Sequence, residues 1–166
     1  MYFLITQIIG AIAYILIAIS FYKKEKKKIL LLQILSYIGF TIHYYLLGGL
    51  TGTVCNIIGL AALILIYIFD LYFKNKKKLL VFIIIPILIS ISLLTYDNIY
   101  SIFPIIASIM SLISFLKDNT NLIRLIGILS ASCWCIYAII YKSYASIIFE
   151  VITITSTIIA YLKNKK

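Results

Sequence analysis

The sequence predicts an all-α membrane protein with seven transmembrane helices in a single domain over residues 1–166. Two observations lead to this fold class. The chain is 64% hydrophobic and only 12% charged, with a mean hydropathy of +1.14, whereas about a quarter of the residues in soluble domains are charged. It also divides into seven apolar stretches, each near the roughly 20 residues that cross a bilayer core of about 30 Å. A lipid bilayer is therefore the first partner that we expect.

The predicted helices follow one another along the chain with short polar breaks between them. They cover residues 3–22, 29–48, 52–73, 79–95, 100–116, 121–141 and 144–163. No basic region precedes the first stretch and no small-residue cleavage site follows it, so we interpret it as a retained helix rather than as a secretory signal. The lengths of the seven stretches leave no room for a soluble domain.

The breaks alternate between basic and neutral segments. Basic residues follow the first, third, fifth and seventh helices: "KKEKKK" at 23–28, "KNKKK" at 74–78, Lys117 with Arg124, and the lysines at 163, 165 and 166. This side holds fourteen of the fifteen Lys and Arg residues. Because basic loops remain in the cytoplasm, we expect the N-terminus outside and the C-terminus in the cytoplasm. The net charge of +10 thus reflects topology, and we expect no nucleic-acid partner.

The helices also show an internal repeat. Residues 8–67 align without a gap to residues 102–161, with seventeen identities in sixty positions. This similarity predicts two three-helix repeats, 1–73 and 100–166, joined by a linker helix at 79–95. Each helix of the first repeat and its equivalent in the second are four positions apart in the order of the helices. Because this offset is even, both repeats point the same way through the membrane, in a 3+1+3 arrangement.

The repeat pairs polar and aromatic positions that we interpret as the lining of one substrate cavity. The pairs are Phe40 with Trp134, His43 with Tyr137, and Asn56 with Glu150. Glu150 carries the most information, because a carboxylate in an apolar helix costs about 2.5 to 3.5 kcal/mol on insertion scales and is by default functional. We expect desolvation to disfavour its charged form. The alternative for Trp134 and Tyr137 is an aromatic belt at the membrane interface.

Two positions are candidate hinges. Pro104 is expected to interrupt the hydrogen-bond ladder of the helix at 100–116, and Gly10, its partner in the repeat, to loosen the first helix at the same level.

Catalytic and metal-binding motifs are missing from the sequence. The chain has one histidine and none of the common catalytic signatures, so we expect no enzyme. Cys55, Cys133 and Cys135 lie within predicted spans, and the C-W-C order lacks the spacing of redox or zinc sites. We therefore expect no cofactor and no metal.

Three segments carry a resemblance to a known family. "QIIGAIAYILIAISFYKKEKKK", "IHYYLLGGLTGTVCNII" and "SCWCIYAIIYKSYASIIFE" resemble the YgjV family of bacterial inner membrane proteins over nearly the whole chain. That family in turn resembles the SWEET sugar transporters, the PQ-loop proteins and the PnuC-type vitamin precursor transporters.

The wider resemblance implies a role for matched positions of this chain. SWEETs line their pocket with asparagines on the third helix of each repeat and aromatic residues on the second, and use prolines on the first as hinges. The matching residues here are Asn56 and Glu150, Phe40 and Trp134, and Gly10 and Pro104. Glutamate replaces one asparagine and glycine one proline, so a sugar substrate is not implied.

Together these observations predict a multi-pass protein of the cell inner membrane that transports a small molecule by alternating access. The expected solute is a small polar molecule, such as one like a vitamin or a sugar. The alternative is a non-transporting membrane receptor or adaptor with the same fold. The sequence leaves open whether the chain assembles as a homo-oligomer.

Overall fold

The computed structural model describes residues 2–21, 26–72, 77–96, 98–114 and 119–163. Within these ranges the chain forms seven α-helices, one short 3₁₀ helix and no strand, which confirms the all-α prediction. The elements are α1 (Tyr2–Phe21), α2 (Lys26–Leu46), α3 (Leu50–Tyr72), α4 (Lys77–Leu94), η1 (Ile99–Ser101), α5 (Ile102–Ser114), α6 (Thr120–Ile140) and α7 (Tyr144–Lys163). The predicted boundaries differ from these by only a few residues.

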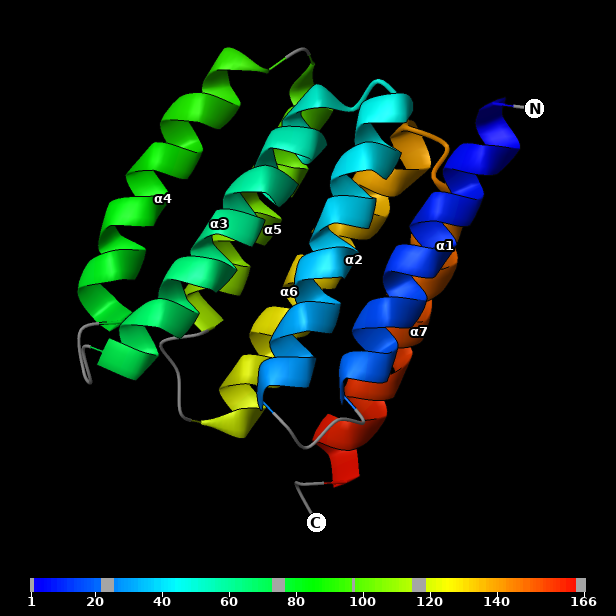
Figure 1. The fold of residues 1–166 in the computed structure, drawn as a ribbon. Coiled ribbons are helices and arrows are strands. Elements are labelled where there is room, and N and C mark those ends of the chain that lie inside the picture. The colour runs from blue at the N-terminus through cyan, green and yellow to red at the C-terminus, as the bar shows by residue number, and fades with distance from the viewer. Residues whose placement is uncertain (1, 22–25, 73–76, 97, 115–118, 164–166) are drawn as a thin grey trace.

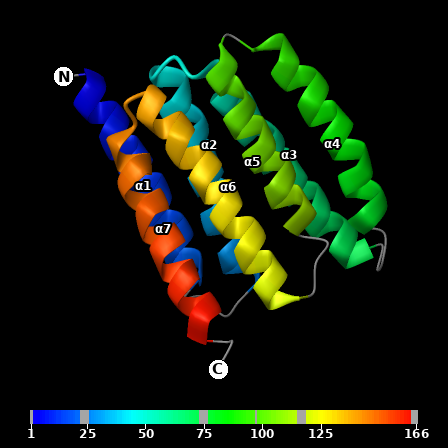
Figure 2. The same ribbon diagram turned by 180° about the vertical axis from the view of Figure 1, so that it is seen from behind.

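The helices lie in two layers (Figures 1 and 2). One layer contains α1, α2 and α3, with α4 beside α3, and the other contains α7, α6 and α5. The layers touch where α1 packs on α7 and where α3 packs on α5, and α4 packs on both α3 and α5. Because contact is made at the two sides, the space between α2 and α6 is left for the cavity described below.

The two ends of the bundle differ. At one end, which we call the turn end, tight turns join α2 to α3 and α6 to α7, and the N-terminus lies there too (Figure 1). Each turn has one residue with positive φ, Gly48 at 79° and Lys142 at 54°. The C-terminus lies at the opposite end, which we call the C-terminal end.

Small residues bring neighbouring helices close together. Ser36 on α2 donates to the Ala13 carbonyl on α1 at 2.7 Å, and Ser130 on α6 donates to the Ala107 carbonyl on α5 at 3.0 Å. At Gly39 an added Cβ would lie 2.8 Å from the Ala13 Cβ. Such small and hydroxyl residues are typical of helix contacts in membranes, where apolar side chains alone give little drive for association.

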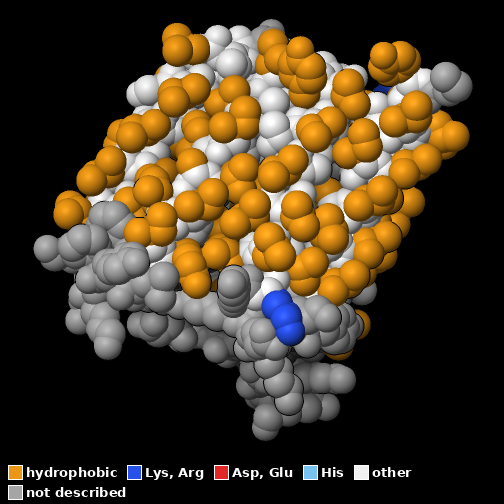
Figure 3. Space-filling model, in the orientation of Figure 1, with side chains coloured by type: hydrophobic (Ala, Val, Ile, Leu, Met, Phe, Trp, Pro, Cys, Tyr) orange, Lys and Arg blue, Asp and Glu red, His pale blue; other side chains and the backbone are white. Residues whose placement is uncertain are grey.

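The outer surface is apolar. Hydrophobic side chains cover the face seen in Figure 3. Among the described residues, Leu94, Phe82 and Leu4 are 85%, 70% and 65% exposed. Such a surface far exceeds the apolar patches of soluble monomers. By length and composition, Tyr2–Ser20 and Asn121–Ile140 could cross a membrane, and five shorter apolar helices accompany them in the described ranges. The bundle is therefore suited to lipid.

Most of the lysines that predict the orientation lie outside the described residues. These are the ones at 23, 24, 74, 76, 117, 165 and 166. Exposed Lys28 and Lys78, in the first turns of α2 and α4, lie toward the C-terminal end, as the alternation of basic breaks requires. The orientation of the termini in the membrane stays a prediction.

Candidate functional site

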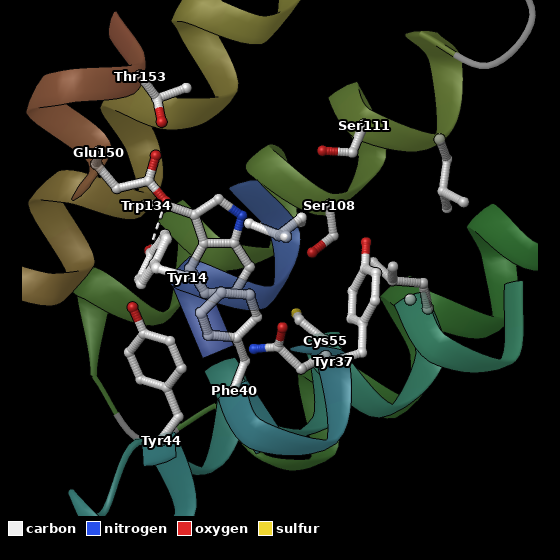
Figure 4. A pocket seen from close by; sticks show the side chains of 15 residues that line it. Tyr14, Tyr37, Phe40, Tyr44, Cys55, Ser108, Ser111, Trp134, Glu150 and Thr153 are labelled. Atoms are coloured by element: carbon white, nitrogen blue, oxygen red, sulfur yellow. Dashed lines mark hydrogen bonds between the residues drawn. The ribbon is translucent and has the colours of Figure 1, made fainter. Parts of the chain in front are cut away.

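A cavity of about 220 Å³ lies between the two layers. Its walls are mainly aromatic and aliphatic. The aromatic residues are Tyr14, Tyr37, Phe40, Tyr44 and Trp134. The polar residues are Asn56, Ser108, Ser111, Glu150 and Thr153 (Figure 4). A mostly apolar pocket with a few convergent polar groups is the usual form of a small-molecule site.

Glu150 provides the carboxylate of the cavity. Its side chain is only 9% exposed, and one carboxyl oxygen accepts a 2.7 Å hydrogen bond from the Tyr14 hydroxyl on α1. The other oxygen is directed toward Thr153 (Figure 4). No ion pair to Glu150 is present among the described residues. A carboxylate can accept several hydrogen bonds, so this group retains capacity for a ligand.

Stacked rings hold Tyr14 in position. Its ring lies parallel to that of Phe149, with centroids 4.8 Å apart, and makes an edge contact with Phe40 at 4.6 Å. The Tyr14 hydroxyl is thereby fixed against Glu150. Trp134 on α6 and Tyr44 on α2 lie with their ring centroids 5.5 Å apart. Both layers therefore contribute aromatic surface to the cavity.

Asn56 and Tyr44 have unused hydrogen-bonding capacity. The Asn56 amide nitrogen donates to the Gly52 carbonyl one turn earlier at 2.8 Å, which leaves its carbonyl oxygen as an acceptor. The Tyr44 hydroxyl is buried and, among the described residues, makes no hydrogen bond. Leaving a buried hydroxyl unpaired costs about 1 to 3 kcal/mol. The nearby Ser143 and Ser146 side chains, as well as a bound solute, can partner the Tyr44 hydroxyl.

Of the residues predicted to line the site, Phe40, Asn56, Trp134 and Glu150 lie on the cavity, and His43 and Tyr137 do not. Both of the latter are fully buried at the turn end. His43 donates from Nδ1 to the Thr6 carbonyl at 2.7 Å, and its Nε2 lies 2.5 Å from the Ser143 hydroxyl. It thus ties α2 to both α1 and the start of α7.

Tyr137 and Gln7 join other helices at the same end. The Tyr137 hydroxyl accepts a 3.0 Å hydrogen bond from the Gly52 backbone N–H, which links α6 to α3. The Gln7 amide donates to the Lys142 carbonyl at 3.0 Å and accepts from the Ala145 N–H at 3.1 Å. We call the contacts of Gln7, His43 and Tyr137 the seal, because they close the bundle between the cavity and the turn end.

Toward the C-terminal end the site continues. A second cavity of about 240 Å³ shares Ser111, Trp134, Glu150 and Thr153 with the first. It extends along α5 and α6 to Ser114 and Gly127. Cavity and hydroxyl groups therefore continue from Glu150 toward the C-terminal end.

The two hinge candidates occupy different surroundings from those predicted. Pro104 lies in the first turn of α5, directly after η1, where a proline removes no intrahelical hydrogen bond. At Gly10 an added Cβ would lie 2.7 Å from the His43 ring, so this glycine permits the close approach of α2. The proline that lies in the interior of a helix is Pro86 in α4, and the sequence analysis does not predict a hinge there.

Sequence reasoning also missed Tyr14 and Tyr44. The signal for Tyr44 was present, because Tyr37, Phe40 and Tyr44 have the i, i+3, i+7 spacing of one helix face. Tyr14 is paired with Ser108 by the repeat, and that pairing gave no sign of its contact with Glu150.

Comparison with known proteins gives one match. The model of the Imp-YgjV family, described as a bacterial inner membrane protein, matches residues 4–166. A search of the curated proteins and a search of the solved structures found no match.

Proposed function

The chain belongs to the Imp-YgjV family of bacterial inner membrane proteins, and from this premise we propose that it is a transporter. All seven helices cross the membrane, a small solute binds in the cavity between the layers, and the bundle opens alternately to the two sides. The observation that carries this proposal is the buried Glu150 in a cavity that is sealed at the turn end and continued by hydroxyl groups toward the C-terminal end. We propose no catalytic step and no cofactor.

We also propose that the two layers are related by an internal repeat, with α4 as the linker of a 3+1+3 arrangement. Matching hydrogen bonds support this. Those donated by the backbone N–H groups of Leu47, Gly48, Gly49, Leu50 and Thr53 all recur 94 residues later. The bonds of Ser36 to Ala13 and of Ser130 to Ala107 match in the same way, as do the positive φ angles of Gly48 and Lys142.

This arrangement supports a distant relationship to the SWEET and PnuC-type transporters, which we include in the proposal. In such folds a binding site lies between the repeats, and rocking of one repeat against the other exposes it to either side. Here the seal would have to open as the C-terminal end closes. With the C-terminus in the cytoplasm, the structure corresponds to a state closed to the outside.

A receptor with the same fold needs only one open mouth, and a transporter needs both in turn. Labelling of introduced cysteines separates the two. In a chain whose three cysteines are replaced by alanine, Ser146→Cys reports on the sealed side and Ser114→Cys on the opposite side. A transporter in intact cells should allow an impermeant thiol reagent to reach Ser146→Cys slowly from outside.

Uptake is the direct test. Proteoliposomes containing the protein should accumulate at least one solute from a broad panel of metabolites, and empty liposomes should not. Failure of every solute together with a permanently protected Ser146→Cys would reject transport and favour the receptor. Lys142→Cys serves as a labelling control, because Lys142 is exposed in the turn between α6 and α7 at the turn end.

A further inference from the structure

We infer that the solute is a small organic cation, held by the Glu150 carboxylate on one side and by aromatic rings on the other. This inference deepens the proposed function and rests on it. Four properties of the cavity support it: its charge, its aromatic rings, its hydrogen-bonding groups and its size.

Among the described residues, the cavity holds an acidic group without a basic one. No Lys, Arg or His is among its lining residues. His43, the one histidine of the chain, is engaged with the Thr6 carbonyl and with Ser143 at the seal. A carboxylate in a membrane interior needs a compensating charge, and the described lining residues offer none, so we assign it to a proton or a cation from outside the chain.

The titratable groups among the described residues that interact electrostatically with Glu150 do not supply this charge. They are Tyr14 on α1, Tyr44 on α2 and Cys135 on α6. All three are neutral when protonated, and none can become positive. The lining residues of α3 and α5 include Cys55 and two serines, which are no source of positive charge either.

Aromatic rings surround the space in front of the carboxylate. Trp134 on α6 and Phe40 on α2 line it, with Tyr14 and Tyr44 nearby (Figure 4). Ring faces carry partial negative charge and attract ammonium groups, most strongly when water is excluded, and cages of this type recognise quaternary ammonium ligands.

The remaining polar groups favour a donor on the solute. The free oxygen of Asn56 is an acceptor, and the Tyr44 hydroxyl can act either way. A sugar, by contrast, would place several hydroxyls against Ile17, Leu88 and Leu112, where they would lack partners. At about 220 Å³ the cavity is smaller than the roughly 300 to 1,000 Å³ of pockets for drug-sized ligands, so it suits a small solute.

The test compares cations with neutral compounds of the same shape. One pair is benzylammonium and benzyl alcohol. The other is choline and its analogue in which a tert-butyl group replaces the trimethylammonium group. Calorimetric titration of the purified protein in lipid nanodiscs should show at least one cation binding about tenfold or more tightly than its neutral counterpart.

Three variants test which residues cause the preference for the cation. Glu150→Gln keeps the shape of the side chain and should reduce the preference for the cation to near unity, whereas Glu150→Asp should retain part of it. Phe40→Leu should weaken cation binding, and the matched control Phe82→Leu should not, because Phe82 is 70% exposed on α4. Lowering the pH should weaken cation binding to the natural protein, because a proton competes for the same carboxylate, and should have no effect in Glu150→Gln.

The outcomes separate this inference from the proposed function. If neither cation is preferred over its neutral counterpart, or if Glu150→Gln keeps the preference, the substrate class is wrong. Should proteoliposomes then still take up a neutral solute, transport stands without the cation. If a cation binds with the expected dependence on Glu150 but no solute is moved, the cation site stands and transport fails.

Discussion

At the residue scale, the hydroxyl of Tyr14 controls how the Glu150 carboxylate is presented to the cavity. The bond between them is the hydrogen bond that holds Glu150 in the described structure, and it joins α1 to α7 across the chain. Hydrogen bonds to charged groups contribute about 1.5 to 3 kcal/mol. The position of the carboxylate thus depends on a residue from the other layer.

Tyr14→Phe should therefore weaken cation binding by about tenfold, the effect of about 1.4 kcal/mol, while the ring contacts with Phe149 and Phe40 remain. Binding of benzyl alcohol should change little, since it does not depend on the carboxylate. Calorimetric titration of both compounds measures the two effects. Equal loss for both, or no loss for either, would contradict this role. Tyr45→Phe is the control, because Tyr45 is 63% exposed.

Gly10 offers a second test at this scale. Gly10→Ala would place a methyl group 2.7 Å from the His43 ring and push α1 from α2. We expect overpacking to lower the free energy of unfolding by about 1 to 3 kcal/mol, measured as a lower Tm in detergent. Gly127→Ala is the matched control, because nothing lies within 4 Å of its added Cβ. A similar Tm for both variants would show that the close approach is not important.

Single residues also show why the candidate site was predictable only in part. Asn56 and Glu150 are evident in the sequence because polar groups are rare in apolar helices. His43 lies three residues after Phe40 but on another face of α2, where it contacts Thr6 and Ser143. Tyr44, one residue further along, returns to the face of Phe40 and lines the cavity. Tyr14 was missed because the chain has fourteen tyrosines, and nothing local distinguishes one that faces a carboxylate.

At the element scale, hydropathy located the helices and local hydrogen bonding shifted their ends. The apolar stretch at 100–116 predicts one helix, yet its first residues form η1. The Asn98 side chain accepts from the Tyr100 N–H at 2.9 Å and so caps this turn. Pro104 consequently falls near the start of α5. A hydrophobic pattern cannot report such a cap, which depends on one polar side chain.

The seal is the contact between elements that the proposed alternating access would have to break. Tyr137→Phe removes the hydrogen bond to the Gly52 N–H and should favour opening at the turn end. A typical hydrogen bond contributes about 0.5 to 1.5 kcal/mol, so labelling of Ser146→Cys from outside should become a few-fold to about tenfold faster. Tyr100→Phe provides a control outside the seal. An unchanged labelling rate would show that this bond does not hold the end closed.

At the scale of the whole molecule, an odd number of helices places the two termini at opposite ends of the bundle (Figure 1). The lysine distribution then predicts which end is cytoplasmic. A reporter active only in the cytoplasm should be active after Lys166 and inactive within residues 48–52 at the turn end. Activity in the turn, or its absence at the C-terminus, would reverse the predicted orientation.

The number and order of the helices could be predicted from the sequence because lipid requires long apolar stretches with internally satisfied backbones. The way in which the layers meet could not. It depends on which small residues allow close approach, such as Gly39 against Ala13, and on bonds between distant segments such as Gln7 and Lys142. Neither feature produces a periodic pattern in a single sequence.

The hydrogen bonds of the seal affect which positions of the sequence tolerate substitution. Gln7, His43 and Tyr137 each bond to a main-chain atom, namely the Lys142 carbonyl, the Thr6 carbonyl and the Gly52 N–H. Main-chain carbonyls persist whatever side chain they carry, and the N–H is lost only to proline. The Gln7 contact with Lys142 and the His43 contact with Thr6 therefore each depend on the side chain of one residue rather than two. The Tyr137 contact depends on two, because a Cβ added at Gly52 would lie 2.5 Å from the Tyr137 ring.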